Sequence, residues 1–251
     1  MKAICHLIAS LTLSSTCALA AAATHNYAIS TEPGGIQVLN ISGDSVTVEP
    51  GSPYTPSPVP QPYGGYPQPQ PNLIAVDPTD TYVYALYGSN TPPANTGGPI
   101  RVYSFKLSGG QLHELSSVQG IIASCCEGQT FNYAMVATAH YVFFISTQIY
   151  GSEGGFVSIL KSNSGKLSLA QNYLLKFYNS QDGINYPVGL VVDPAEHYMY
   201  VTYNASHNYE VFDSCTATQC TAIYDITALP NGAPKLISIT PNVLGSMFTA
   251  P

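Results

Sequence analysis

Charged residues are scarce in this chain, and tryptophan is absent. Only 8% of the 251 residues are charged, whereas ordinary soluble domains carry about 25%. Long surface helices need Glu, Lys and Arg on their wet faces, and no long window of the sequence shows the apolar period of about 3.6 residues that a helix requires. The net charge of −7, with only 7 Lys and Arg residues, argues against nucleic acid and acidic membranes as partners. These absences favour an all-β protein.

Membrane-spanning runs are also missing from most of the chain. No apolar run beyond the N-terminus approaches the roughly 18 residues of a transmembrane helix. The N-terminus itself is typical of a signal peptide, because Lys2 precedes a stretch of small apolar residues that ends in a possible cleavage site, Ala18-Leu19-Ala20. We therefore assign residues 1–22 to a signal peptide and residues 23–251 to a secreted or periplasmic domain.

Four cysteines remain after the predicted signal peptide: Cys125, Cys126, Cys215 and Cys220. An even number in an exported chain permits disulfides. Cys215 and Cys220 lie close together in a predicted hairpin and make the best pair, whereas a bridge between the adjacent Cys125 and Cys126 would be strained. A zinc site needs further ligands at suitable spacing, and the sequence offers none.

What the sequence does contain is a repeat. Tyr82, Tyr141 and Tyr198 recur with a period of about 58 residues, each at the start of a β-rich run that comes after an apolar run. In two copies an Asp-Pro pair, at Asp77 and Asp193, separates the two runs. We interpret both Asp residues as turn formers that cap their own backbone.

Each unit holds four strand-like runs, and the last two are joined by a tight glycine turn, Ser108-Gly109-Gly110 or Asn163-Ser164-Gly165. Four strands with a buried innermost one indicate a β-propeller of four-stranded antiparallel blades, with about four blades in this chain. The predicted blades lie near residues 25–71, 72–131, 132–187 and 188–243, and another begins at 244–251. A loop with nine prolines, residues 50–71, comes after the strands of the first unit.

Several of these segments resemble a known group of proteins. Tyr200-Val201-Thr202-Tyr203-Asn204, the Val-Asp-Pro turns, the run 100–105 and the turn 109–112 look like the lactonase-like seven-bladed β-propellers and the related YVTN-repeat propellers. The resemblance covers residues 25–251. It implies an exported lactonase-like protein that hydrolyses or isomerises a sugar lactone.

The number of copies departs from that family. The first copy lacks its innermost strand, and the last consists of that strand alone, residues 244–251. Two accounts fit. The chain is the N-terminal portion of a seven-bladed protein, which we favour, or its final strand closes the first blade and makes a four-bladed ring that leaves no open edge.

Candidate catalytic residues come from the long polar loops, because function in propellers gathers on the face that carries them. They are Arg101, Glu127, Glu153, Asp182 and His207. A lactone hydrolase or isomerase needs a general base and a group that stabilises the developing oxyanion. The three carboxylates could serve as the base or bind a divalent cation, Ca²⁺ or Mg²⁺, and Arg101 or His207 could stabilise charge.

The residues that enter the innermost strands favour a second hypothesis. They are Asn72, Asn132, Tyr133, Tyr186 and Asn242. Members of the family tend to present His, Glu and Arg there, whereas neutral Asn and Tyr suit hydrogen bonding to a small polar ligand. The alternative is therefore a non-catalytic, extracellular or periplasmic propeller that binds a glycan, a protein or a small polar ligand. Whether the protein is an enzyme stays open at this point, and we expect a monomer.

Two histidines occupy the same place in successive repeats, His140 and His197, on the face with the short turns. Equivalent positions in neighbouring blades diverge radially, so we do not expect these side chains to share a metal ion.

Overall fold

The computed structural model describes ten stretches of the chain, and all statements below concern them. They are residues 18–22, 25–57, 71–88, 100–119, 130–148, 155–175, 178–179, 183–184, 186–204 and 219–241. Every helix or strand assigned within them is a β-strand. None of these stretches forms a helix of the length and apolar character needed to cross a membrane.

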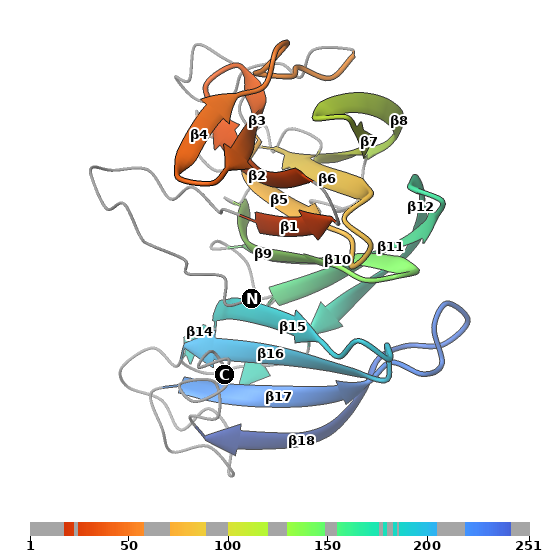
Figure 1. The fold of residues 1–251 in the computed structure, drawn as a ribbon. Helices are drawn as coiled ribbons and strands as arrows, with labels where there is room; N and C mark the ends of the chain where they lie inside the picture. The colour runs from red at the N-terminus through yellow and green to blue at the C-terminus, as the bar shows by residue number, and fades with distance from the viewer. Residues whose placement is uncertain are drawn as a thin grey trace.

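Four antiparallel four-stranded sheets succeed one another along the chain, and we call them blades 1 to 4 (Figure 1). Blade 1 comprises β1 (Ala18–Ala22), β2 (His25–Glu32), β3 (Gly35–Ser42) and β4 (Ser45–Val48). Blade 2 comprises β5 (Leu73–Val76), β6 (Tyr82–Tyr87), β7 (Arg101–Ser108) and β8 (Gln111–Gln119). Blade 3 comprises β9 (Thr130–Ala137), β10 (Tyr141–Gln148), β11 (Gly155–Asn163) and β12 (Lys166–Leu175). Blade 4 comprises β15 (Tyr186–Val192), β16 (Tyr198–Asn204), β17 (Gln219–Asp225) and β18 (Lys235–Pro241). A small ribbon, β13 (Tyr178–Asn179) and β14 (Gly183–Ile184), lies between blades 3 and 4 in the sequence.

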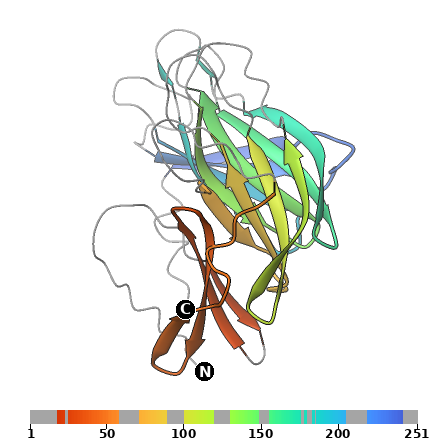
Figure 2. The ribbon, with the colours of Figure 1, turned by 90° about the horizontal axis from the view of Figure 1, so that it is seen from above.

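Within each blade the strands pair in chain order. The first strands of successive blades contact one another, β1 with β5, β5 with β9 and β9 with β15. Figure 2 shows the same sheets turned by 90°, with the red and orange strands of blade 1 beside the remaining blades. The described chain is therefore a partial β-propeller, which confirms the fold class that the repeat predicted.

Blade 1 differs from the prediction. The sequence predicted a first copy without its innermost strand, but β1 pairs with β2 from Ala18↔Ile29 to Ala22↔His25 and completes the sheet. This strand lies inside the segment that we assign to the signal peptide. The physical reason is that an unpaired β2 edge presents free N–H and C=O groups, and a short run of alanines and leucine can satisfy them in an extended conformation.

Tight turns join the strands on one face of the arc, which we call the short-turn face. The two hairpins in which the sequence predicted glycine turns have two central residues with positive φ: Gly109 and Gly110 in blade 2, and Ser164 and Gly165 in blade 3. This is the type I′ geometry that matches the twist of a two-residue hairpin. We call the opposite face, which carries the longer connections, the long-loop face.

Apolar side chains fill the space between consecutive blades. Side chains of β6 alternate, so that Val83, Ala85 and Tyr87 face blade 1, whereas Tyr84 and Leu86 face blade 3. The same alternation in blades 3 and 4 builds a third cluster that contains Phe143, Ile145, Ile159, Met199 and Val201. Each interface thus uses one face of a blade and the opposite face of the next.

Candidate functional site

The Asp-Pro turns on the short-turn face are structural, as the sequence predicted. The Asp77 carboxylate accepts hydrogen bonds from the backbone N–H groups of Thr79, Thr81 and Tyr82 at 3.2, 2.8 and 2.6 Å. The Asp193 carboxylate accepts equivalent bonds from residues 195, 197 and 198. Both carboxylates are engaged by their own turns, so neither is placed for acid–base chemistry.

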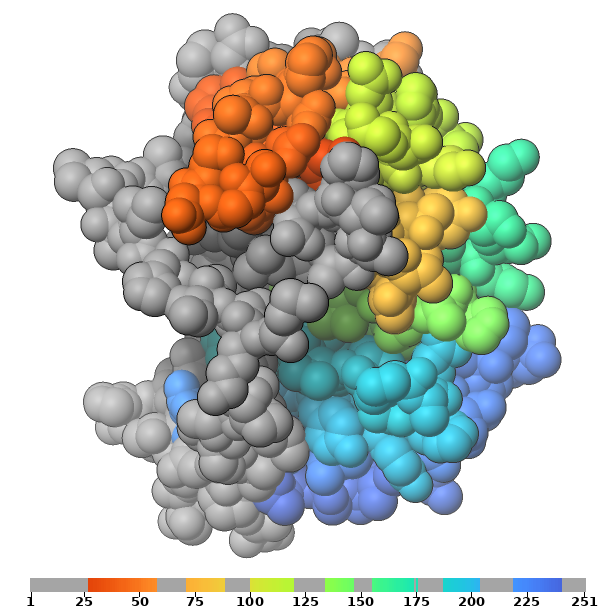
Figure 3. Space-filling model, in the orientation of Figure 1, coloured from red at the N-terminus to blue at the C-terminus, as the bar shows by residue number. Residues whose placement is uncertain are grey.

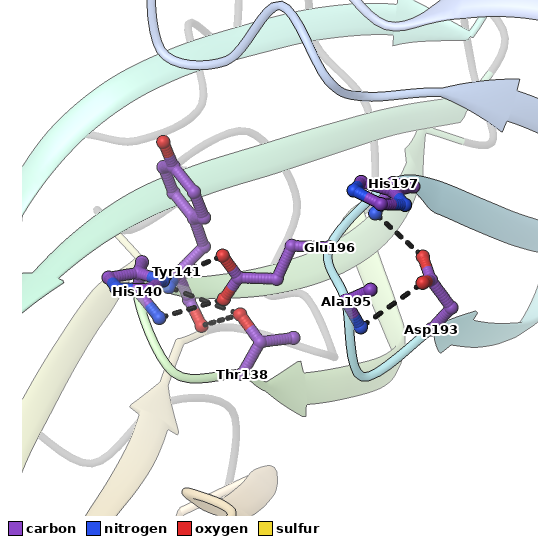
Figure 4. A network of polar contacts seen from close by, with 7 residues as sticks. All are labelled: Thr138, His140, Tyr141, Asp193, Ala195, Glu196 and His197. Carbon is purple, nitrogen blue, oxygen red and sulfur yellow. Dashed lines mark hydrogen bonds and ion pairs between the residues drawn. The ribbon is translucent and has the colours of Figure 1, made fainter.

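One of these turns also carries an ionisable pair that the sequence did not predict. Glu196 comes after Asp193 in the turn of blade 4, and its carboxylate reaches His140 in the turn of blade 3 (Figure 4). Oε1 accepts a hydrogen bond from the backbone N–H of His140, and Oε2 lies 2.8 Å from His140 Nδ1. His140 therefore meets Glu196 and not His197, the residue that occupies its own place in the next repeat.

On the long-loop face, Arg101 lies in a cluster with two tyrosines. Its guanidinium donates hydrogen bonds to Gln119 Oε1 and, at 3.5 Å, to the Tyr103 hydroxyl, and it lies 5.8 Å from the centre of the Tyr103 ring. The Tyr103 ring meets the Tyr87 ring edge-on, with centroids 5.3 Å apart. Burial raises the pKa of Tyr103, and the nearby Arg101 partly offsets that increase.

The Tyr87 hydroxyl is buried and has no hydrogen-bond partner within the described part of the chain. Burial raises the pKa of this phenol far above its ordinary value, and the neighbouring Tyr103 and Glu114 add to the effect. The hydroxyl is therefore protonated at any physiological pH and is available as a donor. A buried hydroxyl without a hydrogen-bond partner costs free energy. A hydrogen bond from the Tyr87 hydroxyl to a ligand or a water molecule would remove this cost.

Equivalent positions in the next two blades also carry hydroxyl groups. Ser146 ends the buried part of β10 with an unpaired Oγ, and Tyr203 lies at the same place in β16, where its hydroxyl is 3.3 Å from that of Tyr224. Each of the three residues comes five positions after the repeat tyrosine of its strand. A comparison of the repeats at that position would have identified these three hydroxyl-bearing residues from the sequence. Sequence reasoning missed them because its candidate catalytic residues came from the loops.

The predicted ligand-binding residues lie at the entrances of the innermost strands where they are described. Asn72 directly precedes β5, its backbone N–H donates to Leu86 O at 2.8 Å, and its amide donates to Gly88 O at 2.9 Å. Asn132 and Tyr133 belong to β9, and Tyr186 begins β15. Asn242 lies outside the described residues. The ligand-binding role of these residues therefore stays a prediction.

Four of the five predicted catalytic residues, Glu127, Glu153, Asp182 and His207, lie outside the described stretches, and Arg101 is the fifth. The described side chains bring together no group of three or more His, Cys, Asp or Glu residues that could hold a metal ion. Those residues alone therefore do not fit a Ca²⁺ or Mg²⁺ site, and we derive no chemical step through a cation.

Cys220, in β17, forms a disulfide. The other five cysteines lie outside the described part of the chain, so its pairing with Cys215 stays a prediction.

Comparison with known proteins supports the fold. The structure is similar to that of a periplasmic gluconolactonase from Pseudomonas aeruginosa, with a TM-score of 0.51 and 17% sequence identity, over 83% of this chain and 52% of that one. Hydrazine synthase from Kuenenia stuttgartiensis matches with a TM-score of 0.49 and 13% identity, over 86% of this chain and 59% of that chain. The chain therefore spans about half the length of the gluconolactonase. No protein-family model matches the sequence, and no curated protein matches it significantly.

Proposed function

We propose that this protein is an exported propeller that binds a sugar lactone on its long-loop face and hydrolyses it. The observation that carries the proposal is the cluster of Arg101, Tyr103 and Tyr87. The half-buried Arg101 contacts Tyr103, the Tyr103 ring packs edge-on against that of Tyr87, and the buried Tyr87 hydroxyl has no partner among the described residues. The similarity in fold to a periplasmic gluconolactonase supports the choice of substrate class, and the predicted signal peptide supports export.

Lactone hydrolysis needs stabilisation of the oxyanion that forms when water attacks the ring carbonyl. A guanidinium has five N–H donors, and the hydrogen bonds from Arg101 to Gln119 and Tyr103 engage only part of them. Its other N–H groups and the Tyr87 hydroxyl are suitable donors for a carbonyl oxygen. The general base would come from Glu127, Glu153 or Asp182, whose loops belong to the same face by sequence.

The test is proton release from glucono-1,5-lactone by the purified full chain, measured against the spontaneous rate in the same dilute buffer. We expect Arg101→Ala to lower kcat/KM at least about 10-fold, because removing one oxyanion donor commonly costs about 100-fold or more. Lys106→Ala is the matched control, since Lys106 is an exposed cation on the same strand. Repeating the assay with Ca²⁺ and with a chelator tests the predicted cation. Hydrolysis no faster than in buffer would contradict the enzymatic proposal.

A second candidate is binding without turnover. It is favoured by Asn72, a neutral residue at the entrance of an innermost strand whose amide is fixed by Gly88. Titration calorimetry with glucono-1,5-lactone separates the two functions. A saturable heat without proton release would support a binding protein, and the absence of both signals would contradict both candidates for this lactone.

A further inference from the structure

Arg101 differs from the other described cations in its burial and its partners. All lysines in the described stretches are exposed, whereas Arg101 is half-buried. No carboxylate of the described residues forms an ion pair with Arg101, whose guanidinium donates to neutral oxygens of Gln119 and Tyr103. Burial removes part of the hydration of a charge, and a bound anion would compensate for that loss. The guanidinium is therefore a candidate receptor for an anion.

Arg101 lies in the middle of a row of three side chains that crosses blade 2. It pairs directly with Tyr87 of β6 on one side and with Gln119 of β8 on the other. Residues that pair directly project from the same face of a sheet. That face is turned towards blade 1, because Tyr87 and Tyr103 belong to the apolar cluster between blades 1 and 2. In Figure 3 the orange atoms of blade 1 lie against the yellow-green atoms of blade 2.

The row lies at the end of this interface that adjoins the long-loop face, since Tyr87 ends β6 and Arg101 begins β7. Gln119 Oε1 accepts a hydrogen bond from Nη2 of Arg101, and the Tyr103 hydroxyl accepts one from Nη1 at 3.5 Å. The guanidinium carbon also lies 5.8 Å from the centre of the Tyr103 ring. These contacts orient the guanidinium and leave several of its five N–H donors available. Two parallel N–H groups of a guanidinium match the two oxygens of a carboxylate.

The Tyr87 hydroxyl supplies a further donor on the same face. This side chain is only 4% exposed, and its hydroxyl has no hydrogen-bond partner among the described residues. Burial raises the pKa of Tyr87, so the phenol stays protonated and can donate. An ionised carboxylate only accepts hydrogen bonds. The row thus combines a positive charge with donors, which suits a carboxylate better than a neutral carbonyl group.

We propose that this row binds the carboxylate of a sugar acid, the class of product that hydrolysis of a sugar lactone gives, with Arg101 as the receptor. In that reaction water adds to the ring carbonyl and the ring C–O bond breaks, which gives a carboxylate, a hydroxyl group and a released proton. The former carbonyl carbon stays beside the same donors and its oxygens now carry a full negative charge. The sugar acid therefore binds more tightly than the neutral lactone and inhibits its hydrolysis.

Glu114 places a negative charge near this site. Burial is the main cause of the raised pKa values of Tyr87 and Tyr103, and the charge of Glu114 adds to both increases. Glu114 Oε2 accepts a hydrogen bond from the backbone N–H of Ser57 at 2.8 Å. An anion beside these tyrosines is repelled by Glu114, whereas a neutral ligand is not. Removing the charge should therefore strengthen the binding of the sugar acid alone.

The test is titration calorimetry of the purified full chain with sodium gluconate. D-glucitol is the matched neutral ligand, because it keeps the chain of hydroxyl groups and lacks the carboxylate. We expect a saturable heat with gluconate and none with glucitol at the same millimolar concentration. The affinity for gluconate should fall in molar salt, which screens the charges. Equal binding of the two ligands, or no heat with either, would overturn the proposal.

Variants of the receptor locate the bound carboxylate. Arg101→Ala should weaken gluconate binding at least about 10-fold, because hydrogen bonds to charged groups are strong. Arg101→Lys keeps the charge but loses the fork of donors, so its affinity should be intermediate. Lys106→Ala is the matched control and should bind like the parent chain, since Lys106 is an exposed cation on the same strand. Circular dichroism checks folding, and Arg101→Lys carries the test if Arg101→Ala does not fold. An unchanged affinity in a folded Arg101 variant would overturn the proposal.

Glu114→Gln gives a readout that loss of structure would not produce. It keeps an acceptor for the Ser57 N–H and removes the charge, so gluconate should bind about 2-fold more tightly. Unchanged or weaker binding would overturn the placement of the carboxylate beside the two tyrosines.

The location of the carboxylate rests on the proposed function, but the two proposals fail separately. If gluconate binds through Arg101 and the lactone is hydrolysed no faster than in buffer, the enzymatic proposal fails and this one stands. If the lactone is hydrolysed and gluconate neither binds nor inhibits proton release, this proposal fails and the enzymatic one stands.

Discussion

Glu196 of blade 4 holds His140 of blade 3 at two points, the backbone N–H and Nδ1, each at 2.8 Å. Glu196 has a φ of 57°, a left-handed conformation that is unfavourable for a residue with a Cβ. Asp193 fixes this turn by accepting hydrogen bonds from the backbone N–H groups just after Glu196. The backbone of this turn in blade 4 therefore places the Glu196 side chain where it binds His140 of the preceding blade.

The first prediction concerns the energy of that contact. We expect a double-mutant cycle of Glu196→Ala and His140→Ala to give a coupling free energy of about 0.5–1 kcal/mol, from urea unfolding midpoints. The value is modest because the His140 side chain is 71% exposed, so water screens the pair. The coupling should shrink in molar salt. A coupling near zero would mean that the His140 side chain adds nothing to the contact, because His140→Ala keeps the backbone N–H that also binds Glu196.

The second prediction compares two equivalent turn aspartates. Asp77→Ala should lower the free energy of unfolding by about 2 kcal/mol or more, because Asp77 is buried and its carboxylate accepts several donors. Asp193→Ala should cost less, since Asp193 is only half-buried. Asp77→Asn, which keeps one acceptor oxygen, should fall between Asp77→Ala and the parent chain. Equal losses at both sites would contradict this explanation.

The third prediction concerns two hairpin glycines. Gly165 has a φ of +78°, and a Cβ there would clash with Tyr82 and Leu115. Gly43 has a φ of +58° but open space around it. Gly43→Ala should cost about 1–2 kcal/mol for the left-handed backbone alone, and Gly165→Ala should cost clearly more because of the added clash. Thermal unfolding of the two variants side by side measures the difference.

The four strands of blade 2 and the four strands of blade 3 could be predicted as elements from the sequence. Apolar runs, turn glycines and Asp-Pro pairs recur there at a fixed period, and local patterns of this kind determine where strands begin and end. The strand β1 (Ala18–Ala22) could not be predicted, because a short run of small apolar residues is equally typical of a signal peptide. The feature that distinguishes the two is the pairing with β2, which is not a local property.

The contacts between blades were harder to predict. The period makes His140 and His197 equivalent, but the residue that His140 contacts in the next blade is Glu196. Likewise, Tyr87 was not predicted as a site residue, because it lies at the end of a regular strand and functional residues in propellers are expected in the loops. Sequence periodicity gives the position of a residue within its blade, and the packing of one blade on the next decides which side chains meet.

The fourth prediction tests the unpaired hydroxyl of Tyr87. Tyr87→Phe should leave the free energy of unfolding unchanged or raise it by up to about 1 kcal/mol, because it removes a buried group that has no described partner. The same variant should weaken lactone binding in calorimetry if the hydroxyl contacts the ligand. Tyr84→Phe is the control that should lose stability, since the Tyr84 hydroxyl forms a buried hydrogen bond to Ser162 at 2.7 Å. A clear loss of stability in Tyr87→Phe would show that its hydroxyl is paired.

The last prediction rests on the raised pKa values of buried tyrosines, among them Tyr87 and Tyr203. A phenol whose pKa is higher in the folded than in the unfolded state contributes stability that is fully present below the unfolded pKa of about 10. Above that pH the unfolded chain loses its protons first, so the free energy of unfolding should fall as pH rises. Each such tyrosine adds a slope of up to about 1.4 kcal/mol per pH unit.

Urea unfolding between pH 8 and pH 11, with phenolate absorbance recorded in parallel, measures this slope. The absorbance should show that one group of tyrosines ionises only when the chain unfolds. Tyr87→Phe should reduce the slope above pH 10 by about the contribution of one phenol, because it removes one of the groups whose pKa burial raises. If the slope were the same in Tyr87→Phe as in the parent chain, Tyr87 would have to ionise alike in both states. Burial at the blade 1–blade 2 interface would then not protect it.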